Sequence, residues 1–331
     1  MQDLQQLREW TGKISSIASG YKLSQLLYTA FDAGVFDLLE VPKTAKEIAT
    51  AMHWSERGSR MLLDGLVALE LAIQTDNTYS NTKIAAACLA KNGCAYQGHI
   101  LRHNHNSWND WMRLADRVRT GTCEPKGEDR TGAPLRDFIL GMRDIATMSA
   151  REVLHALDFR NYTHILDLAC GPGTYAITFL QENPHIKATL FDKPEVIEIA
   201  REEVVRTGLA ERIDYIGGDC ITDDLGSDYD LVFMSNIIHS FSAEENAALV
   251  KRAYDALLPG GAILIKDFIM KNDRSGPAFG LIFALHMLVH TPGGNTYTHE
   301  EIKGWTDKAG FLAGRLISLT PQTRIWLVQK P

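Results

Sequence analysis

Two glycines and an aspartate form the first group of residues whose spacing indicates chemistry. Asp167 stands four residues before Gly171, and Gly171 and Gly173 belong to a G-x-G-x-x-A pattern that ends at Ala176. The pattern joins an apolar strand to a helix, where the backbone can approach a ligand closely at a helix N-terminus. A loop of this kind favours a nucleotide-containing ligand.

Two further carboxylates follow neighbouring apolar strands. Asp192 ends the next strand and suits ribose hydroxyls, and Asp219 follows the third strand, where it can accept a hydrogen bond from an adenine amino group. A single aspartate at such a place is often a helix cap. Because the carboxyl ends of parallel strands form one crevice, we expect the three carboxylates and the glycine loop to converge on one ligand.

Two cofactors fit these residues. In a dinucleotide site the glycines meet a pyrophosphate, whereas S-adenosyl-L-methionine (SAM) has no phosphate and carries a cationic aminoacyl group. A carboxylate at Asp167 suits the aminoacyl group and has no use beside a pyrophosphate. The sequence therefore favours SAM, with S-adenosyl-L-homocysteine (SAH) as product, and an NAD-dependent dehydrogenase is the weaker alternative.

The elements that must position these residues lie after Phe159, where short apolar strands alternate with helices. This βαβ rhythm predicts an α/β fold with a parallel sheet. Two last strands, over 314–318 and 323–328, are joined by a short link and predict a closing antiparallel hairpin, which is typical of methyltransferase sheets. The five parallel strands are expected at 164–168, 188–191, 213–216, 231–234 and 262–265.

The first 95 residues predict a small helical domain. An apolar stripe from Leu23 to Phe31 stops at Gly34, a capping box at 44–47 opens a short helix, and Ser55 opens another. A hairpin around Asp76 and Asn77 completes the order of a winged helix. The helix over 55–70 carries two arginines against three acidic residues, so we do not expect it to bind DNA. Residues 96–160 predict long helices broken by the polar stretch from Thr120 to Pro134, and residues 161–331 the cofactor domain.

Composition limits the classes of partner. The chain of 331 residues is longer than a domain with one hydrophobic core usually is, so we expect two domains. Its 45% of hydrophobic residues suffices for globular domains. A net charge of −7 argues against nucleic acid and anionic membranes as partners. The start has no apolar signal core, and the longest apolar stretch, 279–289, is too short to span a membrane, so we expect a soluble, cytoplasmic protein. Five cysteines without a C-x-x-C pair predict reduced thiols and no zinc ribbon.

The chain resembles the SAM-dependent O-methyltransferases of the plant caffeate and acetylserotonin type, over nearly its full length. Residues 167–173 match the family's D-x-G-G-G-x-G motif with Ala169 and Cys170 in place of two glycines. The resemblance implies an N-terminal winged-helix dimerisation domain, a C-terminal Rossmann-like class I methyltransferase domain, and a homodimer. It also implies cofactor binding by Asp167, Ala169, Gly171, Gly173, Asp192, Asp219, Cys220 and Ser235.

The same resemblance identifies candidate catalytic residues. The segment 236–245 resembles the family's H-D-W-S-D-E signature, whose histidine is the general base, and this makes His239 the base candidate. Asp267 matches the first of two acids that flank the base in the family. His299 stands at the position where the family has its second acid, and Ser240 replaces the usual Asp after the base. These two departures leave open an acidified phenol, or a carbon, nitrogen or sulfur acceptor.

Candidate acceptor-binding residues come from the resemblance as well. They are His103, Phe138, Met142, His286 and Met287, with ordinary core packing as the alternative for the apolar ones. His99 and His103 lie four residues apart on one predicted helix face, but no Cys or carboxylate stands nearby at ligand spacing, so we expect no metal. We interpret the chain as a homodimeric SAM-dependent methyltransferase that acts on a small, aromatic hydroxyl compound. Alternatives are a C-, N- or S-methyltransferase, a SAM-binding relative without methyl transfer, and a SAM-sensing winged-helix regulator.

Overall fold

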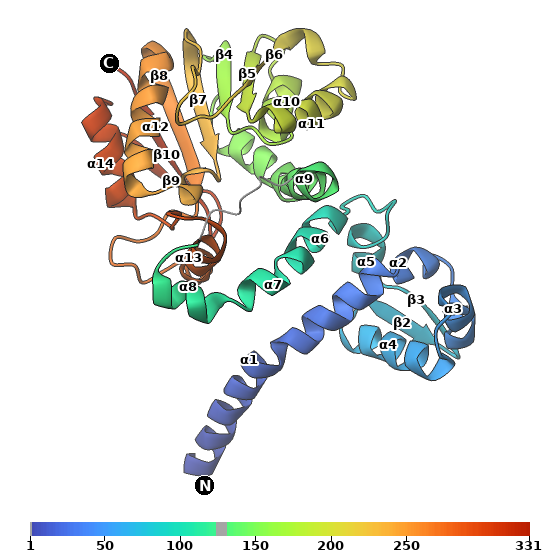
Figure 1. The fold of residues 1–331 in the computed structure, drawn as a ribbon. Coiled ribbons are helices and arrows are strands. Elements are labelled where there is room, and N and C mark those ends of the chain that lie inside the picture. Colours follow the sequence, from blue (N-terminus) through green and yellow to red (C-terminus); the bar gives the residue numbers. More distant parts are fainter. Residues whose placement is uncertain (1, 124–130) are drawn as a thin grey trace. The chain divides into compact units, whose positions relative to one another are not determined.

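The computed structural model describes residues 2–123 and 131–331. The chain divides into two compact units, Met1–His105 and Asn106–Pro331, each described here by itself (Figure 1). The first unit extends past residue 95, where the sequence places the end of the first domain. Within the described residues, no helix has the length and apolar character needed to cross a membrane.

The first unit is mainly helical with a small sheet. Its three strands lie in the order β1-β3-β2. The predicted capping box at Thr44 and Glu47, the helix after Ser55 and the hairpin around Asp76 are all present. Its elements are α1 (Gln2–Asp32), α2 (Val35–Leu38), β1 (Lys43–Thr44), α3 (Ala45–Met52), α4 (Glu56–Ala68), β2 (Ala72–Thr75), β3 (Thr78–Asn81), α5 (Lys83–Cys88) and α6 (Gly98–Asn106).

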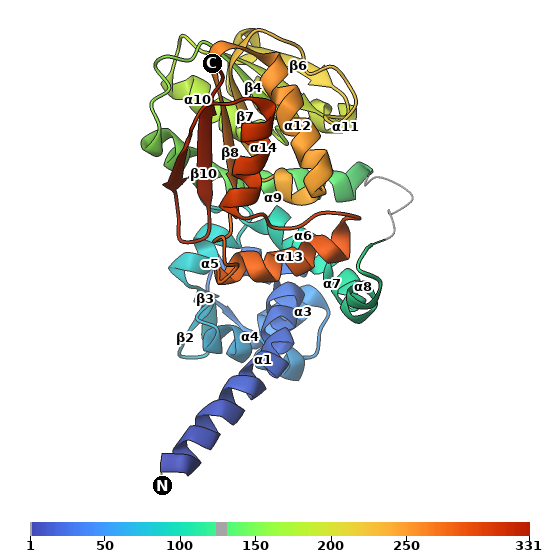
Figure 2. The ribbon, with the colours of Figure 1, turned by 90° about the vertical axis from the view of Figure 1, so that its left-hand side faces the viewer.

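Helix α1 is a single long helix whose first half extends away from the rest of its unit (Figure 2). Its C-terminal end packs into the core of the unit through Ala30 and Phe31. The N-terminal part exposes large apolar side chains at a spacing of three or four residues, namely Leu4, Leu7, Trp10, Ile14, Ile17 and Tyr21. We call these six side chains the α1 stripe.

The second unit is a three-layer α/β arrangement. Its elements are α7 (Trp108–Trp111), α8 (Leu114–Thr120), α9 (Gly132–Ala156), β4 (His164–Leu168), α10 (Thr174–Glu182), β5 (Lys187–Asp192), α11 (Pro194–Val205), η1 (Ala210–Arg212), β6 (Ile213–Gly217), β7 (Tyr229–Ser235), η2 (Ile238–Ser240), α12 (Ala243–Ala256), β8 (Leu257–Asp267), α13 (Ala278–His290), α14 (His299–Ala309), β9 (Arg315–Ser318) and β10 (Arg324–Gln329). Every strand predicted from the sequence in this unit is present.

Within residues 131–331, these strands form a seven-stranded sheet in the order β6-β5-β4-β7-β8-β10-β9. The first five strands are parallel, and β10 pairs antiparallel with both β8 and β9, which confirms the predicted closing hairpin. The strand order reverses at β4, between β5 and β7. In sheets of this kind, ligands bind outside the carboxyl ends of the strands at such a reversal.

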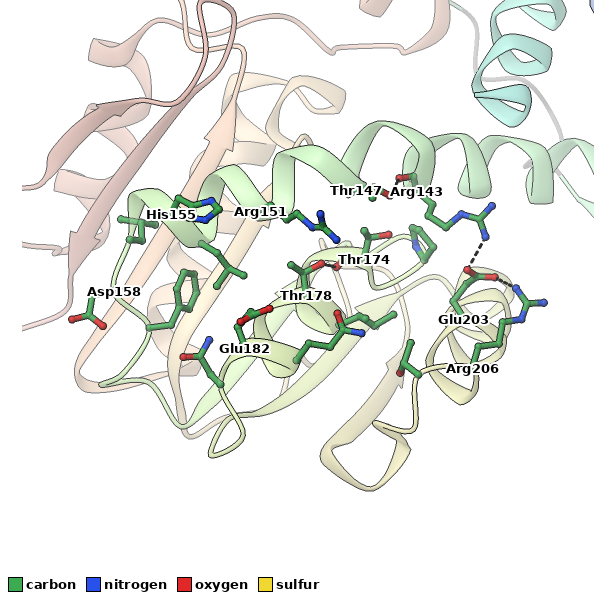
Figure 3. Close-up of a pocket in the computed structure, with 18 of the residues that line it drawn as sticks. Arg143, Thr147, Arg151, His155, Asp158, Thr174, Thr178, Glu182, Glu203 and Arg206 are labelled. Atoms are coloured by element: carbon green, nitrogen blue, oxygen red, sulfur yellow. Dashed lines mark hydrogen bonds and ion pairs between the residues drawn. The ribbon is translucent and has the colours of Figure 1, made fainter. Parts of the chain in front are cut away.

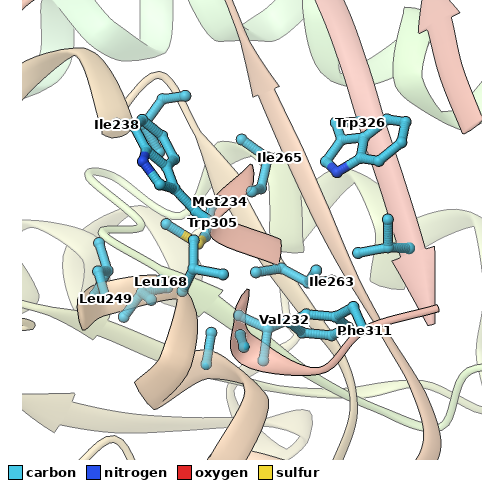
Figure 4. Packing of buried hydrophobic residues seen from close by; sticks show 14 of the residues in the cluster. Leu168, Val232, Met234, Ile238, Leu249, Ile263, Ile265, Trp305, Phe311 and Trp326 are labelled. Carbon is cyan, nitrogen blue, oxygen red and sulfur yellow. The ribbon is translucent and has the colours of Figure 1, made fainter. Parts of the chain in front are cut away.

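Two hydrophobic layers cover the sheet. On one face Leu168, Val232 and Ile265 pack against α12 and α14 (Figure 4). On the other face Phe233 and Leu264 pack against α9, α10 and α11. Side chains alternate between the two faces along each strand, so the residues at the strand ends are also assigned to one face or the other.

The segment 96–160 differs in part from expectation. Before the polar stretch, the structure has the short helices α6, α7 and α8 instead of long ones, and only α9, after it, is long. Asn106 ends α6 and Ser107 precedes α7, and both residue types favour helix ends over helix interiors. The middle of the predicted linker, 124–130, lies outside the described residues.

Candidate active site

The glycine loop after β4 has the backbone conformation that its sequence predicts. Gly171 and Gly173 have φ of 56° and 74°, and Ala169, in place of a family glycine, also has a positive φ of 60°. An L-residue in this region costs roughly 1–2 kcal/mol because its Cβ crowds the backbone. The loop therefore keeps the same conformation with alanine, at a modest cost.

Asp192, at the end of β5, holds this loop in place. One carboxylate oxygen accepts a hydrogen bond from the Gly171 amide at 2.8 Å, and the other accepts one from the Lys193 amide at 2.8 Å. Burial raises the pKa of the Asp192 carboxyl to about 6, against the opposing effect of these amide bonds. A ligand hydroxyl that donates to Asp192 would thus meet a carboxylate already fixed beside the glycine loop.

Asp167, on β4, is almost fully buried under the first turn of α10. Its carboxylate accepts a hydrogen bond from the Ala176 amide at 3.3 Å. Burial raises the pKa of the Asp167 carboxyl to about 8, and the nearby charge of Asp192 adds to the shift. An ammonium group bound beside this carboxyl would favour its ionised form.

The remaining predicted cofactor residues lie around the same edge of the sheet. Asp219 follows β6 and accepts a hydrogen bond from the Ile221 amide at 2.8 Å. Cys220 beside it has a thiol pKa raised to about 12 by burial, so the thiol stays protonated. Ser235 ends β7, and its hydroxyl donates to the Asn236 side chain at 3.1 Å. With Asp167 and Asp192, these positions supply the acceptor groups that the ammonium, ribose and adenine parts of SAM require.

The raised pKa of Asp167 predicts that cofactor affinity depends on pH. In the free protein this carboxyl is protonated below about pH 8, whereas an ammonium group beside it requires the ionised form. Binding then releases a proton, so SAH affinity should rise by up to roughly tenfold per pH unit and level off above about pH 8. Calorimetry in two buffers of different ionisation enthalpy measures both the affinity and the released proton. A flat affinity between pH 6.5 and 8, or the same slope in D167N, contradicts the assignment.

The predicted catalytic pair is assembled at the ends of β7 and β8. The Nδ1 atom of His239 lies 2.8 Å and 3.1 Å from the two carboxylate oxygens of Asp267. The Phe268 amide donates to the nearer of these oxygens at 2.8 Å. An ionised carboxylate can only accept hydrogen bonds, so the imidazole of His239 carries its proton on Nδ1. Its Nε2 atom then presents a lone pair. Both side chains are buried, and the pair has the arrangement of an oriented general base.

Backbone contacts fix the turn that carries His239. The carbonyl of His239 accepts the Asn295 amide at 3.0 Å, and the buried Asn246 of α12 donates to the Ile238 carbonyl at 2.8 Å. A Cβ at Gly294 would lie 2.4 Å from the His239 carbonyl oxygen, so only glycine fits there. A capping box of Ser242 and Glu245 starts α12 immediately after this turn.

A column of rings leads from His239 along α13. The ring of Phe283 lies 4.9 Å from that of His239 and 5.4 Å from that of His286. The indole of Trp111 donates to Nδ1 of His286 at 3.1 Å. An indole N–H can only donate, so neutral His286 carries its proton on Nε2 and is a hydrogen-bond donor from that atom. The sequence does not reveal the Trp111 contact.

His299 lies at the start of α14. It is the first residue of α14, behind the N-cap of Thr298, and its ring packs edge-on against Trp326 at 4.6 Å. Burial lowers the pKa of its imidazole, which favours the neutral form. Within the described residues, the recorded ring contact of His299 is with Trp326, and Asp267 is the carboxylate in ion-pair contact with His239. The T-x-x-E pattern at 298–301 is the sequence signal for this helix start.

The predicted acceptor residues are distributed over several elements. Phe138 and Met142 lie on α9, where Phe138 packs beside Val196 and Ile199, and Met287 is buried on α13. His103 lies on α6 in the first unit. Of its neighbours, His105 pairs with Asp32 and His99 contacts Arg102. Among the described residues, no cluster suitable for a metal ion is found.

A separate cleft of about 740 Å³ lies between α9 and α10 (Figure 3). Arg143 and Arg206 flank Glu203 there and form ion pairs with it, and Thr174 and Thr178 line the α10 side. None of the predicted catalytic residues lines this cleft, although Pro172 of the glycine loop does. Its polar and mutually paired lining does not resemble a site for an apolar aromatic compound.

Comparison with known proteins gives a consistent picture. A family model described as an O-methyltransferase domain matches residues 114–312, and one described as an O-methyltransferase dimerisation domain matches residues 15–91. A 3-hydroxy-5-methyl-1-naphthoate 3-O-methyltransferase of Streptomyces sahachiroi is 30% identical over 90% of this chain and 88% of that protein. An acetylserotonin O-methyltransferase of Gallus gallus is 31% identical over 85% and 86%. The crystal structure of human N-acetylserotonin methyltransferase in complex with SAM is 27% identical and covers 97% of each chain with a TM-score of 0.88.

Proposed function

The chain belongs to the O-methyltransferase family, and on this premise we propose that it methylates a hydroxyl group of a small aromatic compound with His239 as the general base. SAM is the proposed methyl donor, and the related human N-acetylserotonin methyltransferase binds SAM in its crystal structure. The observation that carries the proposal is the buried His239–Asp267 pair at the carboxyl ends of β7 and β8, on the same edge of the sheet as the glycine loop.

The chemistry requires a nucleophilic oxygen. When bound, SAM supplies an electrophilic methyl group on a sulfonium centre. A phenol with a pKa near 10 is mostly protonated at neutral pH, so removal of its proton by Nε2 of His239 raises the nucleophilicity of the oxygen. Asp267 fixes the tautomer and stabilises the imidazolium that forms. Asp167, Asp192 and Asp219 hold the donor, and its alignment with the oxygen supplies much of the remaining rate.

The surroundings of the base support an aromatic acceptor. Phe268, Phe279 and Phe283 pack against one another beside His239, with ring centroids 4.7 to 5.7 Å apart. Aromatic rings pack favourably on such surfaces. The named relatives act on naphthoate and acetylserotonin, which are aromatic compounds as well.

A direct assay tests the proposal. The protein is incubated with methyl-labelled SAM and a panel of naphthols, hydroxynaphthoates and indolic phenols, and the products are identified by mass spectrometry and NMR. We expect an O-methyl product and one SAH for each product molecule formed. A labelled methyl group found on a carbon, nitrogen or sulfur atom of the acceptor would assign a different activity. SAM binding without methyl transfer to any acceptor would do the same.

We also propose that the protein is a homodimer that uses the α1 stripe. The dimerisation-domain match and the winged-helix order of α3, α4 and the β2–β3 hairpin support this proposal. Ile14 and Ile17 are 67% and 70% exposed on α1, and burial of each is worth about 1.5–3 kcal/mol. Replacing both with glutamate should weaken association by at least about 100-fold and yield monomer at micromolar concentration.

The matched control for this prediction is the pair Ser15→Glu and Ser16→Glu, which adds the same charge to other positions of α1. Both variants and the parent are compared by size-exclusion chromatography with light scattering. A parent that is monomeric at micromolar concentration would contradict the proposal. A dimer that survives in the Ile14→Glu, Ile17→Glu variant would place the interface elsewhere.

A further inference from the structure

Lys266 is a buried lysine near the end of β8, between Ile265 and Asp267 of the same strand. Its side chain is 3% exposed. The Nζ atom donates to the side-chain oxygen of Asn236 at 2.7 Å and lies 5.6 Å from the centre of the Tyr175 ring. A lysine ammonium has three N–H donors, and these two contacts occupy only part of its capacity.

In the part of the chain that the structure describes, no carboxylate lies within ion-pair distance of Lys266, whose side-chain contacts are those with Asn236 and Tyr175. A buried cation is unfavourable unless it is paired and hydrogen-bonded. Asn236, which supplies the single hydrogen-bond acceptor, itself has a positive φ of 56°. The chain thus holds a strained turn and an unpaired charge next to each other at one strand end, as preformed binding sites often do.

The position of Lys266 relates it to the glycine loop. Leu264 packs on the α9–α10 face of the sheet, and Lys266, two residues further along β8, belongs to the same face. The first turn of α10 lies on this face directly after Gly173. Asp167 accepts the amide of Ala176 in this turn, and Lys266 lies over the ring of Tyr175, the residue before it. An acidic and a basic side chain therefore flank one helical turn beside the loop.

We propose that Lys266 binds the carboxylate of the aminoacyl end of SAM and SAH, opposite the ammonium group held by Asp167. The two side chains together form a site for a zwitterionic amino acid group. This inference rests on the proposed function, because it assumes that SAM is the ligand of the glycine loop. It assigns to β8 a cofactor contact in addition to those of β4, β5, β6 and β7.

The experiment is a double-mutant cycle in which one change is made in the protein and the other in the ligand. Dissociation constants are measured by calorimetry for SAH and for its analogue that lacks only the carboxylate, with the parent and with K266M. The parent should prefer SAH by about 10- to 100-fold, the range expected for a charge-assisted hydrogen bond. K266M should bind the two ligands within about threefold of each other. K266R should keep most of the preference, because it retains the charge.

The controls separate this role from a structural one. K251M removes an exposed lysine of α12, which pairs with Asp255, and should keep the parent's preference. If K266M does not fold, K266Q, which can still donate to Asn236, replaces it. Equal losses of affinity for both ligands, or an unchanged preference in K266M or K266Q, would overturn the role of Lys266. A parent that binds neither ligand would instead overturn the proposed function.

Discussion

Replacing His239 with glutamine is expected to lower kcat by about 10²- to 10⁴-fold, the usual contribution of a general base. Glutamine keeps a hydrogen-bonding side chain of similar length but cannot accept a proton near neutral pH. The substituted side chain lies on η2, outside the glycine loop, so SAH affinity should stay within about twofold of the parent. Calorimetry and steady-state kinetics on the same preparation separate the two effects.

The control for this prediction is D267N. One oxygen of Asp267 accepts hydrogen bonds from both His239 and the backbone amide of Phe268. In D267N the side-chain oxygen of asparagine can accept both hydrogen bonds, but the negative charge is lost. The variant should therefore lose less activity than H239Q. A weakened SAH affinity in H239Q, together with an unchanged kcat at saturation, would assign His239 to cofactor binding.

Replacing Asp192 with alanine is expected to weaken SAH binding by about 10²- to 10⁴-fold. Two charge-assisted hydrogen bonds to the ribose, each worth about 1.5–3 kcal/mol, would be lost. The structure gives a second reason for weaker SAH binding. In D192A the Gly171 amide loses its hydrogen-bond partner, and the glycine loop loses a contact that holds its conformation. Measurements belong at pH 8, where Asp192 is ionised.

The asparagine variant D192N separates these two causes. It can still accept from the Gly171 amide but has lost the charge, so its affinity should lie between those of D192A and the parent. Thermal unfolding of both variants shows whether the loop contact contributes to stability. An SAH affinity in D192A equal to that of the parent would remove Asp192 from the cofactor site.

Local sequence signals predict much of the fold and of the cofactor site. The capping box at Thr44 is present as expected, because it depends on two residues that stand three positions apart. The strand ends with Asp167 and Asp192 follow from short apolar runs and from the rule that parallel strands share one edge. The pairing of His239 with Asp267 is expected from the family resemblance, and the turn after β7 brings His239 to the end of β8.

Contacts between distant parts of the chain explain what the sequence does not predict. The Trp111–His286 hydrogen bond joins residues 175 positions apart, and no local pattern indicates it. His299 packs on Trp326 because Thr298 caps α14, a signal that competes with the match to the family's second acid. Lys266 could have been noticed as a lysine in an apolar strand, but its missing counter-charge is visible only in three dimensions.

The most direct test of base-catalysed methyl transfer to oxygen is the ratio of turnover between the parent and H239Q across phenols of graded pKa. An acceptor with a high pKa needs proton removal, whereas an acidified phenol is already ionised and needs less help. We predict a ratio that is largest for the least acidic phenols and falls steadily as the acceptor pKa decreases. Equal turnover by H239Q and the parent across the series would contradict the general-base mechanism.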